Sequence, residues 1–169
     1  MKPLAIAAGT AAIALVAGKT AAAAIRVPFD DIFSRFSQLY GVPKRLMVSI
    51  VAHESKFDPR AVNEETVADR KRGRDVDSLG LGQILFPDTA SDYGITDREQ
   101  LFDPVTNLEI VAKHLRARVR RYPVPAGDYP EDVVSAYNGG HSLRTNGGAF
   151  ANQEYVDLVK IQWEKYANV

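Results

Sequence analysis

The chain has 169 residues, 46% of them hydrophobic and 25% charged, which is enough for one domain with a hydrophobic core. Its 21 Lys and Arg residues balance its 21 Asp and Glu residues, so no net charge favours nucleic acid or an anionic membrane surface as a partner. The sequence lacks cysteine, which excludes disulfides, zinc–thiolate sites and cysteine nucleophiles.

The first 25 residues differ in kind from the rest. An uncharged stretch, mostly Ala, Ile, Leu and Val, fills positions 4–18 between a basic start and the alanines at 21–24. This pattern is typical of a secretory signal peptide with cleavage near Ala24. Extended to Ile25, the segment reaches the ~20 residues of a membrane span, so an uncleaved anchor is the alternative. We therefore expect an exported protein, with residues 1–25 as signal peptide or membrane anchor and 26–169 as its domain.

The first two predicted helices flank a glycine. Asp30 is expected to cap a helix over 30–40, and Gly41 suits the left-handed position at its end. Pro43 opens the second helix, which runs to about residue 54. The inward positions expected on the first helix are Ile32, Phe33, Phe36, Leu39 and Tyr40.

Glu54 stands out on the second helix because of the face it shares. Leu46, Met47, Ile50 and Val51 recur at helical spacing and form one apolar stripe. Glu54 follows Ile50 by four residues, so it lies on the same stripe. A glutamate there is either a working acid or the residue that ends the helix before Asp58-Pro59, and position alone leaves the two about even.

The middle of the chain is polar and then rich in glycine. Charges of both signs fill 63–77, a surface excursion whose basic cluster at 70–74 is better explained by solvation than by an anionic polymer. In the following Ser78-Leu79-Gly80-Leu81-Gly82-Gln83 run, the glycines allow a close approach of backbone, and Gln83 offers both a donor and an acceptor.

The rest of the chain predicts more helices. A short helix is expected over 87–93, a capping box at Thr96–Glu99, and a long helix from Asp103-Pro104. The long helix should place Val105, Leu108, Val111, Leu115 and Val119 inward and its arginines at 116, 118, 120 and 121 outward. Helices from Pro130 to Tyr137 and around Tyr155, Val159 and Trp163 complete a mainly α domain, and no segment alternates as a strand does.

Several chemistries have no signature in the sequence. The three histidines, His53, His114 and His141, are scattered without metal-ligand spacing, and there is no nucleophile elbow, P-loop or dinucleotide fingerprint. We expect neither metal nor cofactor, and no nucleic acid. His53 points about 100° away from Glu54 around the helix, so it is expected to pack or to face solvent.

Four blocks in order resemble the motifs of soluble lytic transglycosylase (SLT) domains. They are His53-Glu54-Ser55 with Phe57, Pro59 and Ala61-Val62; Ser78-x-Gly80-Leu81-x-Gln83-Ile84; Ala136-Tyr137-Asn138-Gly139-Gly140; and Tyr155-Val156. Asp103-Pro104-x-x-Asn107 also fits, and the similarity spans about 36–166.

The resemblance implies a lysozyme-like, mainly α fold with a cleft for peptidoglycan glycan strands. Glu54 would be the only catalytic carboxylate, protonating the glycosidic oxygen between N-acetylmuramic acid and N-acetylglucosamine and then helping the muramic acid C6 hydroxyl to close a 1,6-anhydro ring. Apolar burial raises a carboxyl pKa in the direction that a general acid needs. The hydroxyl of Tyr137 would contact Glu54, and Tyr155 would support it from further away or simply pack. The substrate-binding residues would be Ser78, Gly80, Gln83, Tyr137, Asn138 and Tyr155.

Two departures from the family pattern bear on its details. Gly82 replaces the usual methionine, which predicts an apolar side chain missing from the cleft wall. The long 63–77 stretch resembles an insertion in specialised members of the family, which accompany type IV secretion systems and bacteriophage virions. Two alternatives stay open: a hydrolytic muramidase in which Asp75 or Asp77 positions water, and a non-catalytic glycan-binding or assembly protein.

Overall fold

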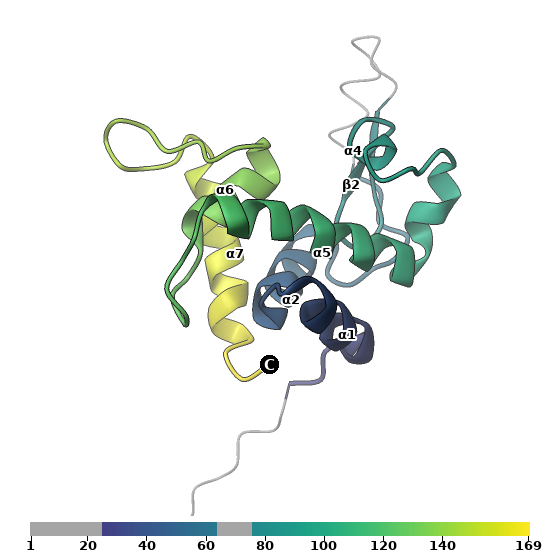
Figure 1. The fold of residues 1–169 in the computed structure, drawn as a ribbon, viewed down its shortest axis with the longest axis horizontal. Coiled ribbons are helices and arrows are strands. Elements are labelled where there is room, and N and C mark those ends of the chain that lie inside the picture. The colour runs from purple at the N-terminus through teal and green to yellow at the C-terminus, as the bar shows by residue number, and fades with distance from the viewer. Residues whose placement is uncertain (1–24, 64–75) are drawn as a thin grey trace, which may run out of the picture.

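The computed structural model describes residues 25–63 and 76–169 (Figure 1). Within these ranges the chain is mainly helical, as predicted, and no helix is long and apolar enough to cross a membrane. The predicted signal or anchor segment, except Ile25, and the basic cluster at 70–74 lie outside the described residues. The elements are α1 Asp30–Tyr40, α2 Lys44–Glu54, β1 Asp77–Leu79, β2 Ile84–Phe86, α4 Asp88–Ser91, the 3₁₀ helix η1 Arg98–Phe102, α5 Pro104–Arg121, α6 Glu131–Gly139 and α7 Gln153–Lys165.

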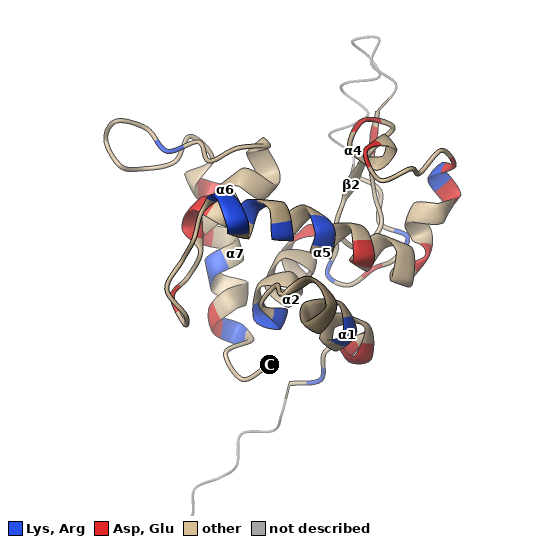
Figure 2. Cartoon of the chain, in the orientation of Figure 1, with Lys and Arg blue, Asp and Glu red and all other residues tan. Residues whose placement is uncertain are grey.

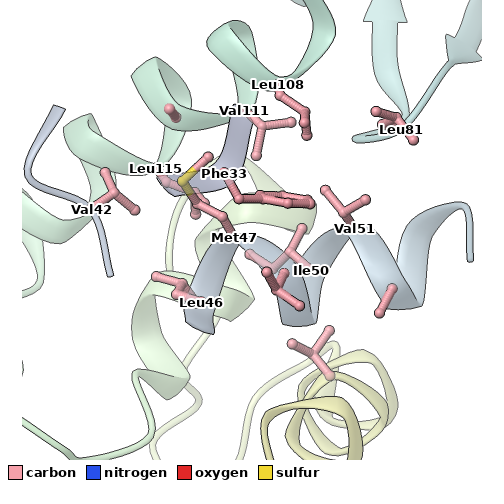
Figure 3. Packing of buried hydrophobic residues seen from close by; sticks show 14 of the residues in the cluster. Phe33, Val42, Leu46, Met47, Ile50, Val51, Leu81, Leu108, Val111 and Leu115 are labelled. Atoms are coloured by element: carbon pink, nitrogen blue, oxygen red, sulfur yellow. The ribbon is translucent and has the colours of Figure 1, made fainter. Parts of the chain in front are cut away.

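Helix α2 is the centre of the core. Every residue from Leu46 to Ala52 is buried, because α1, α5 and α7 all pack against this helix. Figure 3 shows Phe33 of α1 and Val111 and Leu115 of α5 beside it. The sequence predicts one apolar stripe, but between Leu46 and Ala52 every side of the helix is buried. A carboxyl group at the end of such a helix therefore lies next to an apolar core.

Helix α1 begins and packs somewhat differently from the prediction. Phe29 occupies the N-cap position, and Asp30 is the first helical residue, where it pairs with Lys44 at 2.7 Å. The expected cap by Asp30 is therefore wrong, although an acidic residue in the first turn still complements the helix dipole. Phe33 is fully buried, whereas Leu39, also expected to face inward, is 59% exposed. Gly41 adopts the predicted left-handed conformation, with φ 63°.

A small sheet that the sequence analysis missed lies at the far end of α5 from α6 (Figure 1). β1 and β2 pair antiparallel, with Ser78 opposite Leu85 and Leu79 opposite Ile84. Strands of three residues are too short for alternation to be recognised in a sequence. The hairpin turn is the glycine-rich run, which the sheet holds against η1 and α5.

Helix α5 links the hairpin to the α6–α7 pair (Figure 1). It begins at Pro104, as predicted, and Asp103 caps it by accepting a 2.8 Å hydrogen bond from the Thr106 amide. The expected capping box before η1 starts one residue too early, because Asp97 rather than Thr96 is the N-cap residue. Val105 is 40% exposed, against the prediction, whereas Leu108, Val111 and Leu115 are buried. Figure 2 shows basic residues gathered toward the α6 end of this helix.

Candidate active site

Glu54 is the last residue of α2, where the chain turns sharply away from the helix axis. Lys56 and Phe57 both adopt positive φ angles, 54° and 66°. The Phe57 ring packs edge-on against Phe33 and Tyr166, with centroids 6.3 and 6.0 Å away, which fixes the path of the chain after the helix. The carboxyl group is thereby left at the end of a buried helix.

Two adjoining hollows meet at Glu54 and together form the cleft. One has a volume of about 370 Å³ and the other about 570 Å³, and Glu54, Asn63 and Gln83 line both. Burial raises the pKa of Glu54 from 4.5 to about 7, and a hydrogen bond from Tyr155 opposes that rise. A carboxyl group with this pKa holds its proton over much of the range near neutral pH, as a general acid requires.

Tyr155 is the tyrosine whose hydroxyl is hydrogen-bonded to Glu54. Its hydroxyl donates a 2.6 Å hydrogen bond to Glu54 Oε1, and its ring lies edge-on to His53 with centroids 5.0 Å apart. The Tyr137 hydroxyl instead donates to the carbonyl of Gly82 at 2.7 Å. The Tyr137 hydroxyl therefore hydrogen-bonds the glycine-rich turn rather than Glu54, although both residues line the same hollow and the charge of Glu54 helps to raise the pKa of Tyr137. His53, expected to pack or to face solvent, packs against Tyr155 and also lines the 570 Å³ hollow.

Asn107 holds the glycine-rich turn in place. This fully buried side chain accepts a 2.8 Å hydrogen bond from the Gly82 amide and donates to the carbonyls of Leu79 and Leu101 at 3.0 and 2.8 Å. Gly80 has φ 70°, and a Cβ there would lie 2.2 Å from the Leu101 carbonyl oxygen. The predicted close approach of backbone is confirmed, but Gly80 is buried in the turn and does not line the cleft.

Gly82 faces the interior of the domain. A Cβ at this position would lie 2.1 Å from Val111 Cγ2 and 2.9 Å from the Tyr137 hydroxyl. The space for a side chain is thus already filled by α5 and α6. The prediction that Gly82 leaves an apolar side chain missing from the cleft wall is wrong for this chain, because Gly82 is buried and does not line the cleft.

Gln83 lies at the junction of the two hollows, with its backbone in the left-handed region at φ 50°. Its amide nitrogen donates to the carbonyls of Ala61 and Gly80, at 3.2 and 2.9 Å. Both amide hydrogens are therefore used within the protein, and the amide oxygen is what Gln83 offers to a ligand. The sequence predicts that Gln83 offers a ligand both a donor and an acceptor, whereas in the structure only the acceptor, its amide oxygen, is left for a ligand.

Ser78 of β1 and Asn138 of α6 both line the 370 Å³ hollow. Asn138 is exposed, and its side-chain oxygen accepts a 3.0 Å hydrogen bond from Asn152. That bond leaves the amide hydrogens of Asn138 as donors for a ligand. Among the predicted binding residues, the structure brings Ser78, Gln83, Tyr137 and Asn138 to the hollow that contains Glu54.

Two residues of α5 that sequence reasoning did not place in the site also line this hollow. His114 lies edge-on to Tyr137 at 5.3 Å, its Nδ1 is 3.1 Å from the Tyr93 hydroxyl, and burial lowers its pKa to about 4. Arg118, expected to point outward, is partly buried beside it. Helical spacing could have indicated their place in the site, because positions 107, 111, 114 and 118 share one face of the helix.

Asp77 does not face the cleft. It is 4% exposed, and its carboxylate pairs with Arg98 at 2.9 Å. Successive side chains on a strand point to opposite faces, so with Ser78 in the cleft, Asp77 is directed away from it. Among the described residues that line the two hollows, Glu54 is the sole carboxylate, and Asp75 lies outside the described ranges. Those ranges also contain no group of three His, Asp or Glu side chains placed to hold a metal.

A mainly helical domain whose central helix delivers one buried carboxyl group to a cleft defines the lysozyme-like class. The family model of the transglycosylase SLT domain matches residues 31–155, and the chain belongs to this family. The structure also resembles that of an inactive mutant of the lytic transglycosylase Slt from Pseudomonas aeruginosa, with a TM-score of 0.61 at 19% identity. That match covers 83% of this chain and 24% of the other, and it concerns the fold.

Curated relatives carry the name membrane-bound lytic murein transglycosylase C. The protein of Edwardsiella ictaluri is 30% identical over 122 residues, which cover 65% of this chain and 30% of that protein. The protein of Sodalis glossinidius is 31% identical over 114 residues, which cover 62% of this chain and 29% of that protein. The matched region thus spans less than a third of the length of these relatives.

Proposed function

We propose that the protein is a peptidoglycan lytic transglycosylase with Glu54 as its single acid and base. The observation that carries the proposal is a buried carboxyl group with a pKa near 7 at the meeting point of two hollows. Membership of the SLT family and relatives named lytic murein transglycosylases support the same reaction. A glycan strand bound through both hollows would carry its scissile bond past Glu54.

The reaction needs one proton carrier and no added water. Protonated Glu54 donates to the glycosidic oxygen, the bond from muramic acid C1 to that oxygen breaks, and N-acetylglucosamine leaves with a free hydroxyl. The resulting carboxylate takes the proton from the muramic acid C6 hydroxyl as that oxygen bonds to C1. Glu54 is then protonated again, and the product ends in a 1,6-anhydro ring. Most glycosidases use a second carboxylate to act on water or on the sugar, whereas here the substrate supplies the attacking oxygen.

The other predicted site residues take supporting roles in this proposal. The amide oxygen of Gln83 and the amide hydrogens of Asn138 are suited to N-acetyl and hydroxyl groups of the sugars. Ser78 adds a hydroxyl from the β1 side. Tyr155 positions Glu54 through its hydroxyl, while Tyr137 and Gly80 shape the glycine-rich turn.

Mass analysis of digested cell-wall glycan tests the reaction. Transglycosylation produces anhydromuramic ends, whereas a hydrolytic muramidase would produce reducing ends and would contradict the proposal. The inward ion pair of Asp77 favours the first outcome, because that carboxylate is not available to position water. A non-catalytic glycan-binding protein would release no fragments, and its Glu54→Gln variant would bind glycan as well as the unaltered protein does.

We further propose that the protein works in the cell envelope or periplasm, since the substrate is found there and the named relatives are membrane-bound. The first 25 residues supply the export signal or anchor in this proposal. A role in a virion or a secretion system is a prediction from the 63–77 stretch, most of which lies outside the described residues. Determining the amino-terminal residue of the mature protein from the envelope fraction distinguishes a cleaved signal from an anchor.

A further inference from the structure

Arg118 holds a fixed position in the wall of the cleft. Its Nε donates to the carbonyl of Ala136 at 3.2 Å, and its Nη1 donates to the carbonyl of His114 at 3.3 Å. The Ala136 carbonyl belongs to the last turn of α6, so the guanidinium joins the ends of two helices. A planar group held at two nitrogens has little freedom left to lose when it binds a ligand.

The remaining nitrogen, Nη2, has no acceptor among the described residues, and no side-chain nitrogen or oxygen of the described part is buried without a partner. Nη2 is therefore accessible, and Arg118 lines the hollow that contains Glu54. No carboxylate of the described residues forms an ion pair with Arg118. Glu54, which lines the same hollow, is hydrogen-bonded to Tyr155 instead.

A fixed and partly dehydrated guanidinium without an ion pair favours an anionic ligand, and its geometry suits a carboxylate. We propose that Arg118 binds a carboxylate carried on the lactyl side chain of muramic acid, and so determines specificity for peptidoglycan over uncharged glycans. This inference rests on the proposed function, since it takes the occupant of the cleft to be a glycan strand. The carboxylate belongs either to the peptide attached to the lactyl group or, where the peptide has been removed, to the lactyl group itself.

Binding measurements in the Glu54→Gln background test the inference without turnover of the ligand. Three probes are titrated calorimetrically: a peptide-bearing tetrasaccharide from peptidoglycan, the same glycan after amidase treatment, and chitin tetrasaccharide. Adding Arg118→Gln should weaken binding of a carboxylate-bearing probe by about 10-fold or more, the usual effect of losing a hydrogen bond to a charged group. Chitin tetrasaccharide carries no carboxylate, so its affinity should change less than about twofold.

Two further variants separate recognition from structure. Arg118→Lys keeps the charge and should retain part of the preference for the charged probes. Arg120→Gln removes an exposed arginine from the same helix and should affect no probe. Loss restricted to the peptide-bearing probe assigns the carboxylate to the peptide, and loss restricted to the amidase-treated probe assigns it to the lactyl group.

An equal loss for all three probes would mean that Arg118 only supports the fold, and an unchanged affinity for all three would also overturn the inference. In both cases the proposed function would stand, because the cleft would still have bound glycan. If the Glu54→Gln protein with Arg118 intact bound none of the three probes, both proposals would fail.

Discussion

Tyr155, in the first turn of α7, donates a 2.6 Å hydrogen bond to Glu54 at the end of α2, across 101 positions of the chain. Two opposing effects therefore act on one carboxyl group. Burial favours its neutral form and raises its pKa, while the tyrosine hydroxyl stabilises the carboxylate and lowers it. Burial prevails, and the pKa lies at about 7. Burial also raises the pKa of Tyr155 well above 10, so this hydroxyl remains a donor throughout.

The first prediction concerns the pH dependence of lysis. Because the first step of the proposed reaction needs protonated Glu54, the rate should fall as pH rises through about 7, the pKa of that group. Initial rates of turbidity loss from purified peptidoglycan, measured between about pH 5 and pH 9, check this. A rate that stays constant to the top of that range would show that proton donation by Glu54 does not limit the reaction.

Tyr155→Phe should move that decline to higher pH. The substitution removes the hydrogen bond that stabilises the carboxylate, so the pKa of Glu54 rises above about 7. The maximal rate should also fall by roughly 10-fold or more, because the carboxyl group loses its orienting partner. Tyr129→Phe is the matched control, since the Tyr129 hydroxyl donates to the carbonyl of Val156, which lies on α7 beside Tyr155. That control should lower stability and leave the pH profile unchanged; a shift in both variants would contradict the role given to Tyr155.

The sequence predicts the helix that carries Glu54 better than it predicts the hydrogen-bond partners of this glutamate. Periodicity places Glu54 on an apolar stripe and at a helix end, and both features depend only on neighbouring residues. The choice between Tyr137 and Tyr155 depends on how α7 packs against α2 and how α6 packs against α5, which a local pattern does not contain.

Arg118 and the hairpin were missed for a related reason. An arginine near the end of a charged helix has the pattern of a solvated face, and only the packing of α6 against α5 turns its position into part of a cleft wall. The two strands are three residues each, and long-range hydrogen bonds rather than alternation define them. Asn107 fitted the family pattern, but its three buried hydrogen bonds had no sequence signal.

Asn107→Ala should destabilise the domain strongly. It leaves the Gly82 amide and the carbonyls of Leu79 and Leu101 without this partner in a buried place. Unsatisfied buried groups cost about 1–3 kcal/mol each, so we expect a loss of at least ~3 kcal/mol in the free energy of unfolding. Urea denaturation measures it, with the exposed Asn168→Ala as control. A loss below ~1 kcal/mol would show that the turn does not depend on Asn107.

Glu54→Gln should abolish lysis and make the protein more stable at alkaline pH. The pKa of Glu54 is about 7 in the folded protein against an ordinary value of 4.5. Between these values the folded state holds a proton that the unfolded chain has lost, so stability falls as pH rises across this window. The loss is complete above pH ~7 and amounts to about 3 kcal/mol. Glutamine does not ionise, so its advantage in urea denaturation should appear near pH ~8 and vanish near pH ~4.

The last prediction concerns the pair formed by Gly82 and Val111. A Cβ on residue 82 would lie 2.1 Å from Val111 Cγ2, so Gly82→Ala should cost roughly 2–3 kcal/mol through overpacking. Val111→Ala removes that methyl group, and in this background Gly82→Ala should cost at least ~1 kcal/mol less. The relief is partial, because the Tyr137 hydroxyl remains 2.9 Å from the added carbon.

Gly80→Ala is the control for this cycle. Its Cβ would meet the backbone carbonyl of Leu101 at 2.2 Å, and its φ of 70° disfavours any side chain. Shortening Val111 relieves neither problem, so the cost of Gly80→Ala should be the same in both backgrounds. Additive free energies for Gly82→Ala and Val111→Ala in urea denaturation would contradict direct contact between positions 82 and 111, because residues that compete for one space must couple.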